Sequence, residues 1–154
     1  MSKLIKKRIG ENLKLVHRCL EDELFCQNLC DVAFKAKDVL KAGGRLLFCG
    51  NGGSFAQAQH IAAELSGKFQ MKRAPLDALC LAENPAYLTA TSNDYSYETI
   101  FERALNAHGK RGDLLFLLST SGRSKNITKL VPIARNLGVS TVAMTGRHGF
   151  LFAN

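Results

Sequence analysis

The chain has 154 residues, of which 46% are hydrophobic and 22% charged, and its formal net charge at pH 7 is +8. This composition is typical of a single soluble domain with a substantial core, and no apolar run approaches the length that crosses a bilayer. The basic residues are spread along the chain without an aromatic-interleaved patch, which favours a solvated basic surface that attracts anionic metabolites over a nucleic-acid interface. Residues 1–10 lack the apolar segment of a signal peptide, so we expect a cytoplasmic protein.

The five cysteines form an odd set without a CxxC pair, and two of them fall within predicted buried strands. We interpret them as small reduced hydrophobic residues, not as metal ligands or disulfide partners. They are Cys19, Cys26, Cys30, Cys49 and Cys80.

Apolar residues recur at helical spacing from about Leu4 to Leu40, which predicts two amphipathic helices with a break near residues 21–26. Gly43 and Gly44 are expected to close the second helix. The apolar stripe of these helices must be buried somewhere. Packing within the same subunit and packing against a partner subunit both remain open.

The stretch from Arg45 to Phe69 predicts a buried strand, a glycine-rich turn at residues 50–53 and a helix that opens at Ser54. Ser54 and Gln57 fit a capping box, which supports that start. Glycines allow the backbone to approach a ligand closely, and the N–H groups and dipole of the following helix favour an anion. This turn is therefore a candidate phosphate site.

Three further apolar runs, at residues 76–81, 113–118 and 140–144, read as strands. Asn84 is expected to cap a helix with Pro85 at its first position. Residues 93–94 read as a turn before a helix that runs through Leu105, and another helix is expected over residues 125–137, with Gly138 as its stop. Strands that alternate with helices predict an α/β fold with a parallel sheet covered on both faces and ligands at the carboxyl ends of its strands.

A second loop with anion-binding character follows the strand at residues 113–118. Its hydroxyl groups suit phosphate oxygens, and they belong to Ser119, Thr120, Ser121 and Ser124. Because turns favour serine in any case, this loop alone is weak evidence. Two such loops on adjacent parallel strands are stronger evidence for an anion site.

Three blocks, GNGGSxAxAQHIAAEL, SNDYxYE and LLSTSGRSxN, resemble the signature blocks of the sugar isomerase (SIS) fold, and most closely its phosphoheptose isomerase branch. The resemblance covers nearly the whole chain as one SIS domain, with helices at residues 1–42 and an α/β core at residues 45–154. It implies a flavodoxin-like sheet and a homotetramer with active sites at subunit interfaces. It also implies conversion of sedoheptulose 7-phosphate to D-glycero-D-manno-heptose 7-phosphate for lipopolysaccharide heptose.

Carried over by position, the resemblance implies that Glu64 is the acid/base catalyst, a role that suits a carboxylate held above two carbons between which a proton moves. The same comparison places the phosphate on Ser119, Thr120, Ser121 and Ser124, and the sugar on Asn51, Gly52, Gly53, Ser54 and Asp94. His60 would join Glu64 in binding a zinc ion, although two ligands are not a site and a lone helix histidine is more often structural. Without the surrounding block, Glu64 would read as a solvated helix residue. His17, His108 and His148 have no motif around them.

The resemblance also implies a further strand, a serine-containing loop and a helix with an Ile-Gln-Glu-x-His motif, none of which has a counterpart before Asn154. Phe55 and Gln57 stand where Ala and Asp are usual, and the ending is apolar. We therefore expect a shortened or degenerate member, with an open edge on its fourth strand. Two alternatives to an isomerase are a non-catalytic member that binds a phosphosugar or the bacterial replication initiator, and a phosphosugar-sensing regulator, for which residues 1–41 show no helix-turn-helix signal.

Overall fold

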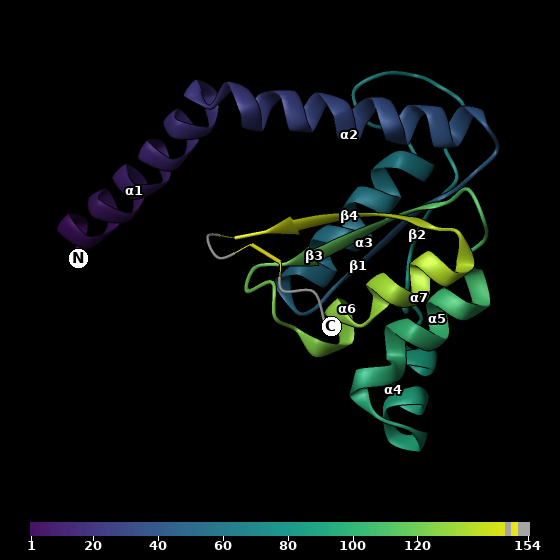
Figure 1. Ribbon diagram of the computed structural model, residues 1–154. Helices are drawn as coiled ribbons and strands as arrows, with labels where there is room; N and C mark the ends of the chain where they lie inside the picture. Colours follow the sequence, from purple (N-terminus) through teal and green to yellow (C-terminus); the bar gives the residue numbers. More distant parts are fainter. Residues whose placement is uncertain (147–148, 151–154) are drawn as a thin grey trace. The chain divides into compact units, whose positions relative to one another are not determined.

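A computed structural model describes residues 1–146 and 149–150 of the chain (Figure 1). The chain divides into two compact units, Met1–Lys37 and Asp38–Asn154. The first contains helix α1, Ser2–Glu21, and most of helix α2, Glu23–Lys41, and the second contains the α/β core.

The break between α1 and α2 falls at Asp22, within the predicted interval. Its carboxylate accepts a hydrogen bond of 2.8 Å from the backbone N–H of Phe25, which stabilises the start of α2. At the other end of α2, Gly43 has a φ of +80° and the N–H of Gly44 bonds to the carbonyl of Val39 at 2.9 Å. The predicted two helices and their glycine stop are confirmed.

Four parallel strands form one sheet in the order β2-β1-β3-β4. Their bounds are Leu46–Gly50 for β1, Ala78–Cys80 for β2, Leu114–Ser119 for β3 and Ser140–Thr145 for β4. The register pairs Phe48 of β1 with Cys80 of β2 and with Phe116 of β3. The predicted α/β class and all four strands are confirmed, and β4 lies at an edge of the described sheet, as expected.

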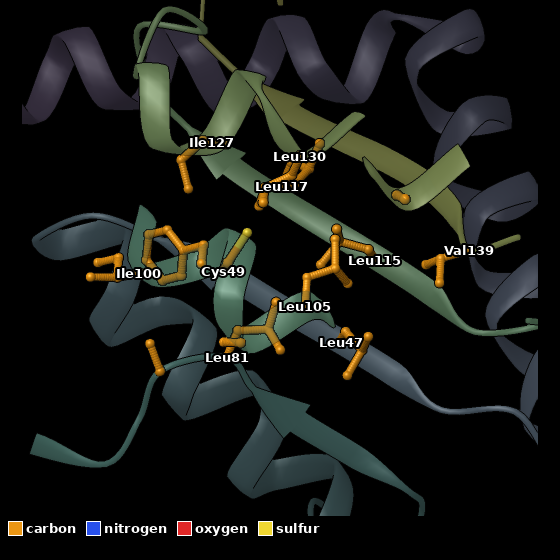
Figure 2. Close-up of a cluster of buried hydrophobic side chains, with 14 residues drawn as sticks. Leu47, Cys49, Leu81, Ile100, Leu105, Leu115, Leu117, Ile127, Leu130 and Val139 are labelled. Carbon is orange, nitrogen blue, oxygen red and sulfur yellow. The ribbon is translucent and has the colours of Figure 1, made fainter. Parts of the chain in front are cut away.

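The helices that follow β2 and β3 are α4 (Pro85–Asp94), the short 3-10 helix η1 (Tyr97–Thr99), α5 (Ile100–His108), α6 (Lys125–Thr128) and α7 (Leu130–Leu137). Helix α3 (Gly53–Ser66) packs on β1 and β2, whereas α5, α6 and α7 lie on the opposite face of the sheet and α4 packs against η1 and α5 (Figure 1). Figure 2 shows the core on that second face, where Leu47 and Leu115 of the sheet meet Leu105 of α5 and Leu130 of α7.

The cysteines of the sheet are part of this packing. Cys49 and Cys80 are buried in β1 and β2, and all five cysteines are free. Burial raises the pKa of the Cys80 thiol to about 12, and the more deeply buried Cys49 thiol also has a raised pKa. Both thiols therefore stay protonated at neutral pH, as expected of small hydrophobic residues. Cys26 and Cys30 are exposed on α2.

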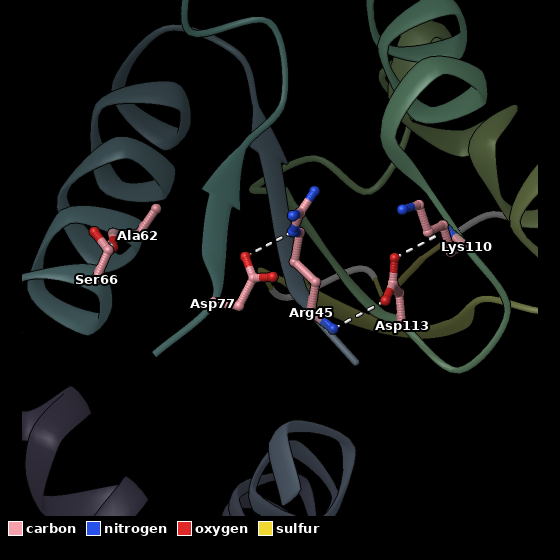
Figure 3. Close-up of polar contacts among 6 residues, drawn as sticks. All are labelled: Arg45, Ala62, Ser66, Asp77, Lys110 and Asp113. Atoms are coloured by element: carbon pink, nitrogen blue, oxygen red, sulfur yellow. Dashed lines mark hydrogen bonds and ion pairs between the residues drawn. The ribbon is translucent and has the colours of Figure 1, made fainter. Parts of the chain in front are cut away.

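The amino ends of the strands are held by a buried carboxylate, shown in Figure 3. Asp113 is 5% exposed and accepts hydrogen bonds of 2.9 Å from the backbone N–H groups of Arg45 and Lys110. The Arg45 guanidinium in turn donates to Asp77 at 2.7 Å, and this carboxylate raises the pKa of Arg45. These contacts fix β1, β2 and β3 at the end of the sheet opposite the predicted ligand loops.

Two helix predictions need correction. Residues 125–137 form two helices, α6 and α7, that separate at Lys129. Pro132 has no N–H to bond with the carbonyl of Thr128, and its ring disfavours a continuous helix there. Residues 93–94 are not a turn but the end of α4, whose start is capped as predicted by the Asn84 side chain. The break comes at Tyr95 and is followed by η1 and then α5.

Candidate functional site

The two predicted ligand loops lie side by side, at the carboxyl ends of neighbouring strands. β1 ends at Gly50, which is in register with Leu118 of β3, and β3 ends one residue later at Ser119. The glycine-rich turn and the serine-rich loop therefore leave neighbouring strands at the same level. This is the crevice that open α/β sheets offer to ligands.

Glycine is required at two positions of the first turn. A Cβ at Gly50 would lie 2.6 Å from the backbone of Ser54, and Gly52 has a φ of +53°. The helix begins at Gly53 with Gly52 as its N-cap, so the prediction that Ser54 caps the helix was wrong. The tight turn at Gly52 leaves Ser54 in the first helical turn, where it lines a cavity.

This first cavity has a volume of about 820 Å³ and lies between α3 and the ends of β3 and β4. Its polar lining includes Ser54 and Gln57 from α3 and Ser119 and Thr120 from the serine loop. The apolar part of the lining comes from Ile61, Leu118 and Met144, among others. The cavity thus brings together predicted residues from both loops.

The serine loop is organised by its own hydrogen bonds. Ser119 is 5% exposed, and its hydroxyl donates to that of Ser124 at 3.3 Å. The Ser121 hydroxyl accepts from the backbone N–H of Arg123 at 3.2 Å, and the Gly122 N–H donates to the Ser119 carbonyl at 2.9 Å. Thr120 and Ser121 are exposed. The loop therefore presents several hydroxyl groups within one short segment, as a phosphate site requires.

Asn51 belongs to a side-chain network that the sequence did not predict. Its amide forms a reciprocal pair with the amide of Asn126, with hydrogen bonds of 2.8 and 2.9 Å. The Tyr97 hydroxyl donates to Asn51 Oδ1 at 2.7 Å. Tyr97 and Asn126 were visible only as members of the second and third signature blocks. Their contact with the glycine turn depends on the fold.

Asp94 lies at the end of α4, is exposed, and accepts a hydrogen bond of 3.0 Å from the side chain of Asn93. It lines neither of the two cavities along α3. The structure therefore does not bring Asp94 together with Ser54 or Ser119 in one cavity. Five other predicted binding residues also line neither cavity: Asn51, Gly52, Gly53, Ser121 and Ser124. The roles of these residues and of Asp94 stay predictions.

Glu64 lines a second cavity of about 430 Å³, together with His60, Ile61, Leu65, Arg73 and residues 69–71. Its side chain is 33% exposed, and its Oε1 lies 3.9 Å from His60 Nε2. Ser54 and Glu64 are ten residues apart on α3, which corresponds to about 15 Å along the helix. Because both cavities include His60 and Ile61, they adjoin along α3.

Arg73 supports the end of α3 that carries Glu64. Its guanidinium donates to the backbone carbonyls of Glu64 at 2.8 Å and Leu65 at 2.7 Å, and to that of Ala74 at 3.0 Å. The last carbonyls of a helix have no partner within the helix, so a fixed guanidinium satisfies them. Sequence patterning did not identify this residue.

The described residues do not make a zinc site. Within residues 1–146 and 149–150, no three His, Cys, Asp or Glu side chains are grouped so that they could hold a metal ion. His60 and Glu64 would supply two ligands, whereas structural zinc takes four protein ligands and catalytic zinc three. Of the other histidines, His17 and His108 are exposed, and His148 lies outside the described residues, as do residues 151–154 of the apolar ending.

Comparisons with known proteins show the family to which the chain belongs. The SIS domain family matches residues 13–146. Phosphoheptose isomerase of Rhodospirillum rubrum is 44% identical over 84% of this chain and 78% of its own length. Phosphoheptose isomerase of Akkermansia muciniphila is 52% identical over 77% of this chain and 62% of its own length, so the chain spans less than two thirds of that relative.

A solved structure of a phosphoheptose isomerase from Francisella tularensis superimposes with a TM-score of 0.86 and 32% sequence identity, over 97% of this chain and 78% of that one. The fold that the resemblance implied is thus confirmed. The family match covers the glycine turn, α3 and the serine loop, which are the parts from which the site is built. This chain belongs to the SIS domain family.

Proposed function

We propose that this chain is a phosphoheptose isomerase that interconverts sedoheptulose 7-phosphate and D-glycero-D-manno-heptose 7-phosphate. One observation carries the proposal. A hydroxyl-rich loop and a carboxylate, both at the positions that the family resemblance implies, line two adjoining cavities along one helix. The relatives named above carry the same activity in their names.

The two groups would act on opposite ends of the substrate. In a heptose 7-phosphate the reacting carbons, C1 and C2, are at one end of the molecule and the phosphate on C7 is at the other. The base near the end of α3 and the phosphate loop beside its start therefore need not line the same cavity. Ser119, Thr120, Ser121 and Ser124 would bind the phosphate, and Asn51, Gly52, Gly53, Ser54 and Asp94 the sugar.

Glu64 would transfer a proton from C1 to C2 of the sugar. Its carboxylate takes the proton from C1 of the ketose while the C2 carbonyl oxygen gains a proton, which gives a 1,2-enediol. The carboxylic acid then returns its proton to C2, and loss of the proton on the C1 oxygen leaves the aldehyde. Glu64 ends in its starting form, and no oxidant or reductant is needed.

The zinc ion implied by the resemblance stays a prediction. The described residues offer only His60 and Glu64 towards it, so we assign it no step in the reaction. Placement of the reaction in lipopolysaccharide heptose synthesis also rests on the resemblance, and its placement in the cytoplasm stays an expectation from the sequence. In the described part of the chain, no helix has both the length and the apolar character of a membrane span.

We also propose that the chain assembles with copies of itself, as a tetramer. All residues of α1 and α2 are described, and none of them is buried. The apolar stripe of α1 includes Ile5, Ile9, Leu13, Val16 and Leu20, each more than 50% exposed. A stripe of this length on the surface is what a contact between subunits would cover.

The non-catalytic alternatives are less well supported. A phosphosugar-binding or replication-initiator-associated protein has no need for a carboxylate at Glu64, whereas this chain retains it within the block that the family match covers. No observation in the structure favours a phosphosugar-sensing regulator.

The test is the replacement Glu64→Gln, which keeps the shape of the side chain and removes its basicity. Because general acid–base catalysis contributes about 10²–10⁴-fold, we expect kcat for sedoheptulose 7-phosphate to fall by that range with little change in binding. Glu23→Gln, at an exposed carboxylate in the first turn of α2, is the matched control and should retain the wild-type rate. An unchanged rate in the Glu64 variant would exclude the proposed mechanism.

A further inference from the structure

Three hydrogen bonds connect parts of the chain that are far apart in sequence. Asn51 lies in the glycine turn, Tyr97 in η1 and Asn126 in α6. Asn51 Nδ2 donates to Asn126 Oδ1 at 2.8 Å, Asn126 Nδ2 donates to Asn51 Oδ1 at 2.9 Å, and the Tyr97 hydroxyl donates to the same Asn51 oxygen at 2.7 Å. Asn126 is 3% exposed, so its amide is largely shielded from water.

The number of bonds determines what Asn51 can still offer a ligand. An amide oxygen accepts two hydrogen bonds and an amide nitrogen donates two. The Asn51 oxygen accepts two hydrogen bonds, one from Asn126 and one from Tyr97. The Asn51 nitrogen donates only one of its two N–H groups, to Asn126. In this arrangement Asn51 presents a hydrogen-bond donor and no acceptor.

The Tyr97 hydroxyl adds a third hydrogen bond to this pair. If both amides rotated by 180°, the pair would remain reciprocal and the second N–H of Asn51 would bond to the tyrosine oxygen, because a phenol hydroxyl can donate or accept. Asn51 would then present an acceptor instead. In the arrangement that the structure shows, Tyr97 donates to the Asn51 oxygen, and one N–H of Asn51 stays available.

We propose that Asn126 and Tyr97 are positioning residues that fix the Asn51 side chain so that its remaining N–H donates to an oxygen of the phosphosugar. This inference rests on the proposed function and deepens it, since it assigns the orientation of a group that binds the sugar. It also links the glycine turn to the first turn after the serine loop. The sugar and phosphate parts of the site are thereby held in register.

The first experiment is nuclear magnetic resonance of the side-chain amides in the ¹⁵N-labelled Glu64→Gln protein, which should bind sedoheptulose 7-phosphate without consuming it. On addition of the sugar phosphate, one of the two Asn51 amide protons should shift, while the proton bonded to Asn126 should stay nearly unchanged. Backbone amides of the serine loop report phosphate binding independently. An unmoved Asn51 pair with a shifted serine loop would overturn the inference and leave the proposed function standing.

If neither the Asn51 amide nor the serine loop responds to the sugar phosphate, the proposed function fails, and the inference fails with it. If both Asn51 protons shift by the same amount, the pair with Asn126 does not hold the amide, and the positioning role is wrong.

The second experiment uses kinetics in the otherwise wild-type protein. Tyr97→Phe removes only the hydroxyl of a half-exposed ring, so the protein should fold. It should raise KM by about three- to tenfold with kcat nearly unchanged. The reason is that it weakens the hydrogen bond from Asn51 to the sugar, which stabilises bound substrate and transition state alike. Tyr95→Phe is the matched control, since Tyr95 is a neighbouring exposed tyrosine whose ring lies 3.9 Å from the Arg103 guanidinium.

Asn126→Asp tests the other partner. The carboxylate still accepts from Asn51 but can no longer donate, so the reciprocal pair is lost and the Asn51 oxygen faces a carboxylate oxygen in either orientation of its amide. We expect kcat/KM to fall by more than in Tyr97→Phe, about tenfold or more, and the shift of the single Asn51 proton to disappear. Wild-type kcat/KM in the Tyr97 and Asn126 variants would overturn the positioning role.

Discussion

At the scale of single residues, Arg73 stabilises the end of the helix on which Glu64 lies. Its guanidinium binds the carbonyls of Glu64 and Leu65 from the loop that follows α3. These carbonyls belong to the last turn of α3, which would otherwise fray. The backbone beneath the Glu64 carboxylate is thus fixed by a residue nine positions later in the chain.

Replacement of Arg73 by Ala should cost about 1–2 kcal/mol in the free energy of unfolding, because hydrogen bonds to partly buried carbonyls are lost. It should also lower kcat several-fold, because Glu64 is no longer held at one height along the helix. Urea denaturation and steady-state kinetics measure the two effects. Lys72→Ala, which removes the adjacent exposed cation, is the control and should change neither.

If Arg73→Ala lowered stability but left kcat at the wild-type value, Arg73 would support the fold alone. Arg73→Lys keeps the charge but not the planar fork, and should fall between the wild type and the Ala variant in both measurements.

Residue patterns predicted the two loops and the family resemblance predicted Glu64, but neither predicted their supporting partners. Ser119–Ser124 and the glycine turn are local motifs, so a few consecutive residues are enough to identify each of them. Asn126 and Tyr97 meet Asn51 across 75 and 46 positions of sequence, and only the folded chain shows that contact. The capping box at Ser54 was wrong for a local reason, because the positive φ of Gly52 lets the helix begin earlier.

At the scale of elements, the hydrophobic pattern was sufficient to predict the strands of the sheet. β1 and β3 are buried at every position, as near-continuous apolar runs predict for the centre of a parallel sheet. Pattern was not sufficient where a proline interrupts a helical stripe, and α6 and α7 therefore appear as two helices. The predicted roles of helices 1–42 in assembly stay predictions.

The apolar stripe of α1 provides a test of assembly. Leu13→Glu places a charge within the stripe, and we expect it to lower the particle mass measured by light scattering, from several chains towards one, because burial of an unpaired charge is costly. Leu15→Glu is the matched control on the same helix. Two positions correspond to about 200° around a helix, so Leu15 lies away from the stripe.

Wild-type protein that scatters as a single chain at micromolar concentration would contradict the proposed assembly. So would equal dissociation by both variants, since the effect would then reflect added charge alone and not the stripe.

At the scale of the whole molecule, the features of the α/β unit are consistent with an isomerase of a long phosphosugar. The amino edge of the sheet is fixed by Asp113 and Arg45, whereas the loops at the carboxyl edge carry hydroxyl and amide groups. Two adjoining cavities extend from those loops along α3 to Glu64. The sugar would therefore lie along this helix, with its phosphate at the serine loop.

The most direct test of this account is a proton magnetic resonance time course of the full chain with sedoheptulose 7-phosphate in deuterated water. We expect the aldose 7-phosphate to form with deuterium at C2, because a proton held by Glu64 can exchange with solvent before its return. The same time course with Glu64→Gln should show neither product nor deuterium entry. Absence of both in the wild-type protein, or their persistence in the variant, would contradict the account.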